Sequence, residues 1–281
     1  GLDVRNYACL DGIPEAKALI AGMVGAKPEQ AIVYGNSSLN IMYDQVARAF
    51  IFGLCGNTPW CKLDKVKFLC PVPGYDRHFA ITEEFGVEMI NIPMTEAGPD
   101  MDMVEKYVNN DASVKGIWCV PKYSNPQGVV YSDETVERFA KLKPAADDFR
   151  IFWDNAYTVH HLYDDNQAEI PNILELCEKE GNPDMVFEFC STSKVTFPGA
   201  GVAGICTSEK NREDIKKRLT IQTIGHDKIN QLRHARFFKD ADGIKAHMAK
   251  HAALIRPKFE LVENILTDEI ASRGIGTWVK P

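Results

Sequence analysis

Strand-like and helix-like segments alternate along most of this chain, and this alternation limits the possible fold more than any other feature of the sequence. The strand-like runs are short and rich in aromatic and β-branched residues. Such an order is typical of an α/β protein with a mostly parallel sheet flanked by helices. The predicted strands are 65–70, 87–92, 114–120, 149–153, 185–190 and 205–208.

Serine residues mark the beginning of two of the predicted helices. Ser37 or Ser38 precedes a helix over 39–50, in which apolar residues recur at helical spacing, and Ser132 precedes a helix over 133–142. A serine side chain at this position accepts a hydrogen bond from an N–H group of the first turn. The other predicted helices are 76–85, 103–110 and 172–180, with another beginning near 208.

Composition and charge exclude several classes of protein. The chain has 281 residues, of which 45% are hydrophobic and 25% charged, and its formal net charge is −7. Phosphate binding calls for a basic face, which this balance of charges does not favour. No apolar run approaches the length of a bilayer span, and no signal-peptide pattern opens the chain. We therefore expect a soluble cytoplasmic protein without nucleic-acid or membrane partners.

The eight cysteines also favour a cytoplasmic protein. None of them forms a C-x-x-C pair, and most lie within apolar runs. Buried free thiols in a reducing compartment explain this pattern better than a disulfide scaffold does.

The pattern changes near residue 244. Residues 245–270 read as one long helix, which Pro257 is expected to kink or break. We expect a large domain over 1–243, and an interdomain helix with the beginning of a smaller domain over 244–281. The chain opens without an initiator methionine and stops in mid-pattern, as expected of a fragment or of a protein whose flanking parts are disordered or cleaved.

The stretch "CSTSKVTFPGAGVAG" at 190–204 contains two competing signals, a lysine among hydroxyl residues and a glycine pattern. The glycines match G-x-G-x-x-G, which binds dinucleotides when it follows a first strand and opens a helix. Here they occur late in the chain and are followed by the strand-like run 205–208. This context favours a loop that enters an edge strand over a dinucleotide site.

Several polar and aromatic side chains stand where predicted strands end or helices begin. In an open α/β sheet, ligands bind at the carboxyl ends of the strands, so these positions are candidates for a site. Helix N-termini, with their free N–H groups, are natural phosphate sites. The candidates are Asp154 and Tyr157 after 149–153, Asn125 after 114–120, Tyr75 after 65–70, and Asn36, Ser37 and Ser38 before 39–50.

Each of these candidates also has a purely structural interpretation. Asp154 can cap a helix, Asn125 can belong to a plain turn, Tyr75 can be a half-buried aromatic residue and Ser37 can be an N-cap. Each structural interpretation is favoured when the residue is taken alone. Chance poorly explains why all of these candidate residues occur together, in this order and each at the end of a strand or helix.

Lys194 gives the set a chemical meaning if it is a Schiff-base lysine. Pyridoxal 5′-phosphate is an aldehyde that needs an acid for its ring nitrogen, donors for its phenolate oxygen, a stacking ring and a phosphate cradle. Asp154 would serve the ring nitrogen, while Tyr157 and Asn125 would serve the phenolate oxygen. Tyr75 would stack on the ring, and the loop 35–40 would hold the phosphate.

The motifs "GNSS", "PGY", "NPQG", "DNAY" and "STSK" resemble those of the pyridoxal-phosphate-dependent aminotransferases of fold type I. They occur in the family's order. The amino-acid sequences of residues 5–44 and 191–204 are most similar to those of the aspartate aminotransferases of the type Ic subgroup. The resemblance covers nearly the whole chain. It implies the large domain of that fold, with a mostly parallel mixed sheet, followed by the beginning of the smaller C-terminal domain.

The resemblance also implies a homodimer with active sites at the subunit interface. Tyr7 falls where the family places a tyrosine that reaches the phosphate in the partner subunit. Ser191 and Ser193 would flank the cofactor, with Ser191 on the phosphate. The sequence departs from the family's pattern at two positively charged positions. Val202 stands where many members have a cationic residue, and the family's carboxylate-binding arginine would lie beyond residue 281. A chain that lacks this arginine is expected to bind cofactor without necessarily turning over.

The implied reaction is transamination through a Schiff base at Lys194, with aspartate and 2-oxoglutarate as the pair that the resemblance favours. Two alternatives stay open. The same cofactor site serves lyases and decarboxylases, and a related domain without turnover occurs as a sensor in transcription regulators.

Histidines give weaker signals. His247 and His251 lie four apart on a predicted helix, as zinc ligands can, but no third ligand is evident and no metal is expected. His160 and His161 follow Tyr157 closely enough to line the site, although packing explains them equally well.

Overall fold

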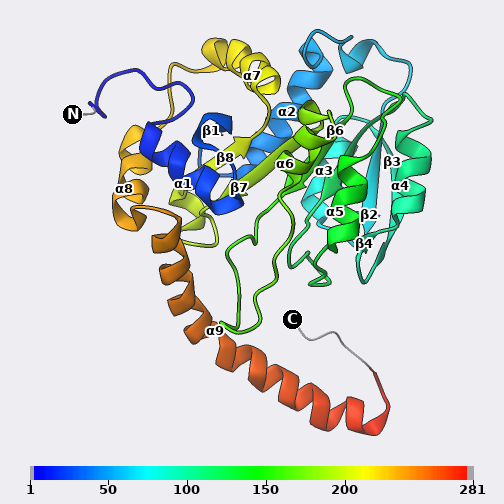
Figure 1. Ribbon diagram of the computed structural model, residues 1–281, viewed down its shortest axis with the longest axis vertical. Helices are drawn as coiled ribbons and strands as arrows, with labels where there is room; N and C mark the ends of the chain where they lie inside the picture. The colour runs from blue at the N-terminus through cyan, green and yellow to red at the C-terminus, as the bar shows by residue number, and fades with distance from the viewer. Residues whose placement is uncertain (1–2, 277–281) are drawn as a thin grey trace.

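The chain forms one mostly parallel sheet flanked by helices in a computed structural model that describes residues 3–276 (Figure 1). Across these residues the strand order is β1-β8-β7-β6-β5-β2-β3-β4. Strands β3, β2, β5, β6 and β7 run parallel to their neighbours, while β8 is antiparallel to β7 and β1, and β4 to β3. The predicted α/β fold is confirmed. The strands are β1 (Ala31–Val33), β2 (Lys67–Val72), β3 (Glu88–Thr95), β4 (Gly98–Pro99), β5 (Val114–Cys119), β6 (Arg150–Asp154), β7 (Val186–Ser191) and β8 (Ala203–Cys206).

The helices follow the predicted order, and the expected serine caps are present. Ser37 Oγ accepts a hydrogen bond from the N–H of Asn40, and Ser132 Oγ accepts one from the N–H of Thr135. Two helices at the sheet's β1 end, α1 and α8, were not predicted. The helices are α1 (Pro14–Val24), α2 (Ser38–Phe52), α3 (Asp76–Glu84), α4 (Met101–Val108), α5 (Asp133–Ala140), α6 (Ile173–Lys179), α7 (Glu209–Gln222), α8 (Lys228–Phe238) and α9 (Ala241–Glu269).

Apolar residues cover both faces of the sheet, because successive strand side chains point to opposite sides. In β6, Ile151 joins the core on one face and Phe152 joins the core on the other, and both are fully buried. The first core is closed by α1, α4, α5, α6, α8 and α9, and the second by α2, α3 and α7. Parallel strands buried in this way end at one common edge, which brings the segments that follow β5, β6 and β7 together.

The glycine-rich segment enters the interior of the sheet, so the expectation that it enters an edge strand is wrong. Strand β8 lies between β7 and β1, and the edge position belongs to β1, which was not predicted because it is only three residues long. A Cβ atom on Gly204 would lie 2.6 Å from Ile20 Cγ2 and 3.0 Å from the Ile32 carbonyl oxygen. Gly204 is thus required by close packing of α1 and β1 against β8.

Replacing Gly204 with alanine is expected to lower the free energy of unfolding by about 1–3 kcal/mol, because the added methyl group overfills a packed contact. The matched control is Gly199→Ala in the same glycine pattern, where an added Cβ meets nothing within 4 Å. The control is expected to change stability by less than about 0.5 kcal/mol. Urea denaturation of both variants measures the difference, and equal effects would contradict the packing explanation.

Helix α9 runs from Ala241 to Glu269 through Pro257 without a break, and it changes direction along its course in Figure 1. The predicted domain boundary at 243/244 falls within its first turn, and the division into two domains stays a prediction. Residues 277–281, which that prediction assigned to the smaller domain, lie outside the described residues.

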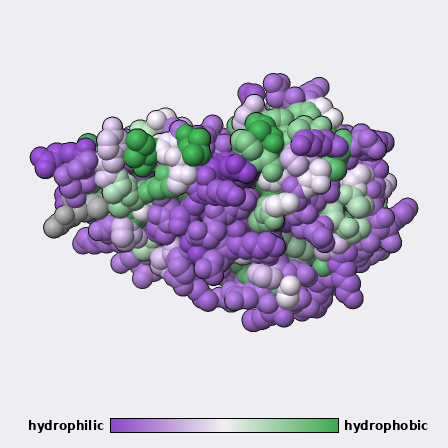
Figure 2. All heavy atoms as spheres, turned by 90° about the horizontal axis from the view of Figure 1, so that it is seen from above, coloured by the Kyte–Doolittle hydropathy of each residue, from purple (hydrophilic) through white to green (hydrophobic). Residues whose placement is uncertain are grey.

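The surface seen from above in Figure 2 is largely hydrophilic, with hydrophobic residues gathered in separate patches. Among residues 3–276, we find no helix with the length and apolar character that crossing a membrane requires. All eight cysteines are free thiols, and five of them are buried.

Candidate active site

The carboxyl edge of the sheet brings Lys194, Asp154 and Tyr157 together. Asp154 is the last residue of β6, Tyr157 lies in the turn that follows it, and Lys194 lies in the turn after β7. The Lys194 amine is 4.7 Å from the centre of the Tyr157 ring. Lys194 is exposed as a whole in this single chain, so its desolvation depends on what covers the turn.

Asp154 is a buried carboxylate with one oxygen engaged and the other free. Its Oδ2 lies 3.0 Å from His78 Nε2, and both side chains are nearly inaccessible to solvent. Its Oδ1 is buried without a hydrogen-bond partner among the described residues. Leaving a buried carboxylate oxygen unpaired is costly, which indicates a place for a hydrogen-bond donor from a bound molecule.

Tyr157 is hydrogen bonded to the Asn125 side chain, which brings together the two predicted phenolate donors. Burial raises the pKa of Tyr157, the charge of Asp154 raises it further, and the Asn125 bond opposes both. The Tyr157 hydroxyl therefore keeps its proton and acts as a donor at neutral pH. Tyr75 and Asn125 line one small cavity of about 20 Å³ together with His78, and the Tyr75 and His78 rings meet edge to face at 5.1 Å.

The hydroxyl groups predicted for the phosphate lie beside the N-terminus of α2. Ser191 Oγ donates to Ser193 Oγ at 3.1 Å, and Ser193 Oγ donates to the Asn36 carbonyl oxygen at 3.1 Å. Ser37 caps α2, and Ser38 begins it. Residues more than 150 positions apart in the chain thus form one cluster of hydroxyl and N–H groups at a positive helix end.

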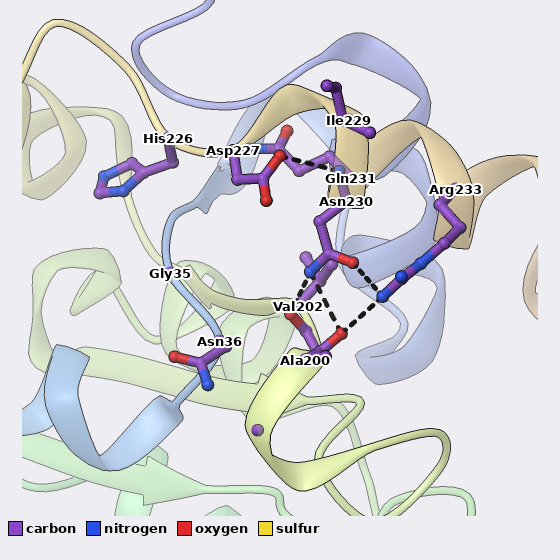
Figure 3. Close-up of a pocket in the computed structure, with 12 residues that line it drawn as sticks. Gly35, Asn36, Ala200, Val202, His226, Asp227, Ile229, Asn230, Gln231 and Arg233 are labelled. Carbon is purple, nitrogen blue, oxygen red and sulfur yellow. Dashed lines mark hydrogen bonds between the residues drawn. The ribbon is translucent and has the colours of Figure 1, made fainter.

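A cavity of about 400 Å³ borders this cluster (Figure 3). Asn36 is the predicted site residue that lines it, so the cavity adjoins the phosphate cluster rather than holding Lys194. Val202 also lines it, although its side chain is 1% exposed and belongs to the core. Arg233 of α8 reaches this cavity and donates to the Ala200 carbonyl oxygen at 3.1 Å, as Figure 3 shows.

Tyr7 does not join the site of its own chain. Its side chain is 74% exposed, and its carbonyl oxygen accepts a hydrogen bond from the buried Lys228 amine at 3.3 Å. The segment before α1 therefore presents this ring outward.

His78 is the residue that sequence reasoning missed. It stands three residues after Tyr75, one turn into α3, and it stacks on Trp118 with ring centres 4.7 Å apart. The spacing from Tyr75 was the available signal, but the contact with Asp154 depends on how α3 packs against the sheet. Glu188, in the neighbouring strand, is a second buried acid that was missed, and burial raises its pKa to about 8.

The described residues contain no cluster of three metal-ligating side chains. His247 and His251 pack ring against ring at 4.5 Å, and His247 Nε2 lies 3.0 Å from the Val195 carbonyl oxygen.

A buried acid at a strand end, a tyrosine after it and a lysine after the next strand define the class of the fold type I aminotransferases. Comparison with known proteins agrees: the family model described as aspartate amino-transferase matches residues 1–281. The chain belongs to this aspartate amino-transferase family.

Individual relatives support the same family assignment. An aspartate aminotransferase of Corynebacterium glutamicum is 48% identical over 282 residues, which cover 100% of this chain and 65% of the relative. The crystal structure of an aspartate transaminase from the same organism matches with a TM-score of 0.96 at 48% identity, covering 100% of this chain and 66% of that chain. The chain thus spans slightly less than two thirds of the length of these relatives.

A more distant structure shares the fold alone. The α-aminoadipate aminotransferase LysN of Thermus thermophilus matches with a TM-score of 0.74 at 20% identity, covering 95% of this chain and 63% of that chain. That structure is described as a complex with N-(5′-phosphopyridoxyl)-L-leucine.

Proposed function

We propose that this chain is the cofactor-binding part of a pyridoxal-phosphate-dependent aminotransferase, with a large domain over 1–243. The observation that carries the proposal is the free, buried Oδ1 of Asp154, at the strand end where Tyr157 and Lys194 meet. A protonated ring nitrogen is the donor that this oxygen lacks. The family relationship and the phosphopyridoxyl compound in LysN support the same cofactor.

The residues of the chain fit the other parts of this cofactor. Tyr157 and Asn125 would donate to its phenolate oxygen, and Tyr75 would contact its ring. Asn36, Ser37, Ser38, Ser191 and Ser193 would hold its phosphate at the α2 terminus. Val202 stands where many family members have a cation for the phosphate. We assign this role to Arg233, because it lines the cavity next to Asn36.

The bound cofactor supplies an electron sink for the electrons released at the substrate's Cα. Lys194 would hold the cofactor, and its free amine would take the proton from that Cα. Asp154 would keep the ring nitrogen protonated, and His78 would support this by holding the carboxylate in place. Tyr157 would orient the ring through its hydroxyl group.

For substrates we propose aspartate as amino donor and 2-oxoglutarate as acceptor, supported by the 48% identical relative. We also propose a homodimer, in which the exposed Tyr7 ring reaches the phosphate of the partner subunit, and a cytoplasmic location, which the free thiols support.

A donor screen tests the reaction. The purified protein, saturated with pyridoxal 5′-phosphate and 2-oxoglutarate, is expected to convert aspartate to oxaloacetate with equimolar glutamate. Formation of alanine from aspartate would contradict transamination and favour a decarboxylase. Cofactor binding without any product from a panel of amino acids would contradict the proposed reaction if it is found for the full-length protein, whereas for residues 1–281 alone it agrees with an arginine that lies beyond them.

A further inference from the structure

Three histidines from three separate elements contact three consecutive residues, beginning at Lys194. His160 Nε2, from the turn after β6, lies 3.3 Å from the Lys194 carbonyl oxygen. His247 Nε2, from α9, lies 3.0 Å from the Val195 carbonyl oxygen. His234 Nε2, from α8, lies 2.9 Å from Thr196 Oγ1. The segment that carries the proposed catalytic lysine is thus surrounded by imidazole rings.

The partners of the rings determine which nitrogen carries the proton. A carbonyl oxygen only accepts, so His160 and His247 must each donate an N–H from Nε2. His234 has the opposite arrangement, because its Nδ1 lies 2.9 Å from the Asn230 carbonyl oxygen and must be the donor. Its bare Nε2 then accepts from the Thr196 hydroxyl. The contacts of His160 and His247 thus require only an N–H at Nε2, whereas His234 makes both of its contacts as the Nδ1–H tautomer.

Burial keeps two of these rings neutral. It lowers the pKa of His160 to about 4 and also lowers the pKa of His234. A neutral His160 fits its place next to Lys194, because a second positive charge beside the amine would be unfavourable.

The segment needs such support, since 194–196 lie in a turn outside the sheet. Two backbone bonds hold its N–H groups, from Val195 and Thr196 to the Thr192 carbonyl oxygen at 2.9 and 2.8 Å. The histidines add contacts to the carbonyl oxygens and to a side chain on the other side of the turn.

We propose that His160, His234 and His247 are positioning residues that fix the turn 194–196 and thereby the place to which the Lys194 amine returns in each turnover. The inference rests on the proposed function of Lys194. The amine must leave the cofactor and move a proton at the substrate's Cα, so its tether must not shift. A displacement of about 1 Å in a positioned group can cost about 10²-fold in rate.

Substitutions that keep or remove the N–H donor test this role. His160→Leu and His247→Leu remove the donor, while His160→Gln and His247→Gln retain one on a similar side chain. We expect the leucine variants to lower kcat by about 10-fold to 10²-fold with little change in KM, and glutamine to restore most of it. The control is Lys250→Leu, an exposed residue of α9 three positions from His247.

A spectroscopic readout separates positioning from general stability. The histidine-to-leucine variants are expected to shift the pH midpoint of the visible absorbance of the Lys194–cofactor adduct, whereas Lys250→Leu should not. Thr196→Val and His234→Leu together should reduce kcat by less than the product of the single effects, because both remove the same hydrogen bond. If a leucine variant fails to fold, the glutamine variant and this double-mutant comparison decide.

Nitrogen-15 NMR of the imidazole rings tests the geometry without cofactor. Protonated Nε2 in His160 and His247 and protonated Nδ1 in His234 are expected. The reverse assignments, or histidine-to-leucine variants indistinguishable from Lys250→Leu in kcat and absorbance, would overturn the proposal. Absence of any adduct at Lys194 in the unmodified protein would instead overturn the proposed function, while the NMR result would still judge the geometry.

Discussion

Lys194→Ala is expected to lower the turnover of aspartate by about 10⁴-fold, the upper end of what a positioned acid–base group contributes. The variant loses both the amine that binds the cofactor and the amine that takes the proton from Cα. It is also expected to lose the visible absorbance of the bound cofactor and the product of borohydride reduction on the peptide containing residue 194. Stopped-time product assays and mass spectrometry of the reduced protein measure the two effects.

The control is Lys250→Ala, which removes an exposed lysine from α9 and should leave both readouts unchanged. A small primary amine added to Lys194→Ala should restore part of the turnover, because it replaces the missing base without a tether. A borohydride-stable adduct retained by Lys194→Ala would show that another residue binds the cofactor.

Asp154→Asn is expected to lower turnover by about 10²-fold to 10³-fold, comparable with the removal of one preorganised electrostatic partner. An amide cannot keep the cofactor's ring nitrogen protonated, so the ring becomes a poorer electron sink. Because Lys194 is untouched, the covalent adduct should still form, with an altered absorbance spectrum. Steady-state kinetics and absorbance on the same sample separate the two effects.

Asp165→Asn, in an exposed loop, is the matched control and should behave as the unmodified protein does. Full turnover in Asp154→Asn would contradict the assignment of Asp154 to the ring nitrogen. Loss of the adduct together with loss of thermal stability would indicate that Asp154 serves mainly to hold His78.

The strand and helix pattern was largely predictable from the sequence because it depends on local periodicity. Strand β6 was expected over 149–153 and occupies Arg150–Asp154, and α5 begins after the predicted Ser132 cap. Strand β1 was missed because three residues carry too little periodic signal, and with it the interior position of β8 was missed. The order of strands in a sheet is not a local property.

The residues of the candidate site also divide into those that the sequence identified and those that only the structure revealed. Asp154, Tyr157 and Asn125 were identified because each stands at or after a strand end, and Lys194 because it lies among hydroxyl residues. The structure brings these residues to one edge. His78 was not identified, because it lies 76 residues from Asp154 in the chain and meets it only when α3 packs against the sheet.

By itself, the sequence determined most of the elements and which reactive side chains stand at their ends, since hydrophobic spacing and turn residues act over a few neighbouring positions. Tertiary structure alone decided what surrounds those side chains. The oxygen of Asp154 left without a partner and the three rings around 194–196 result from packing between segments up to 76 residues apart. Such contacts depend on where whole helices and strands are placed, which no short stretch of the chain specifies.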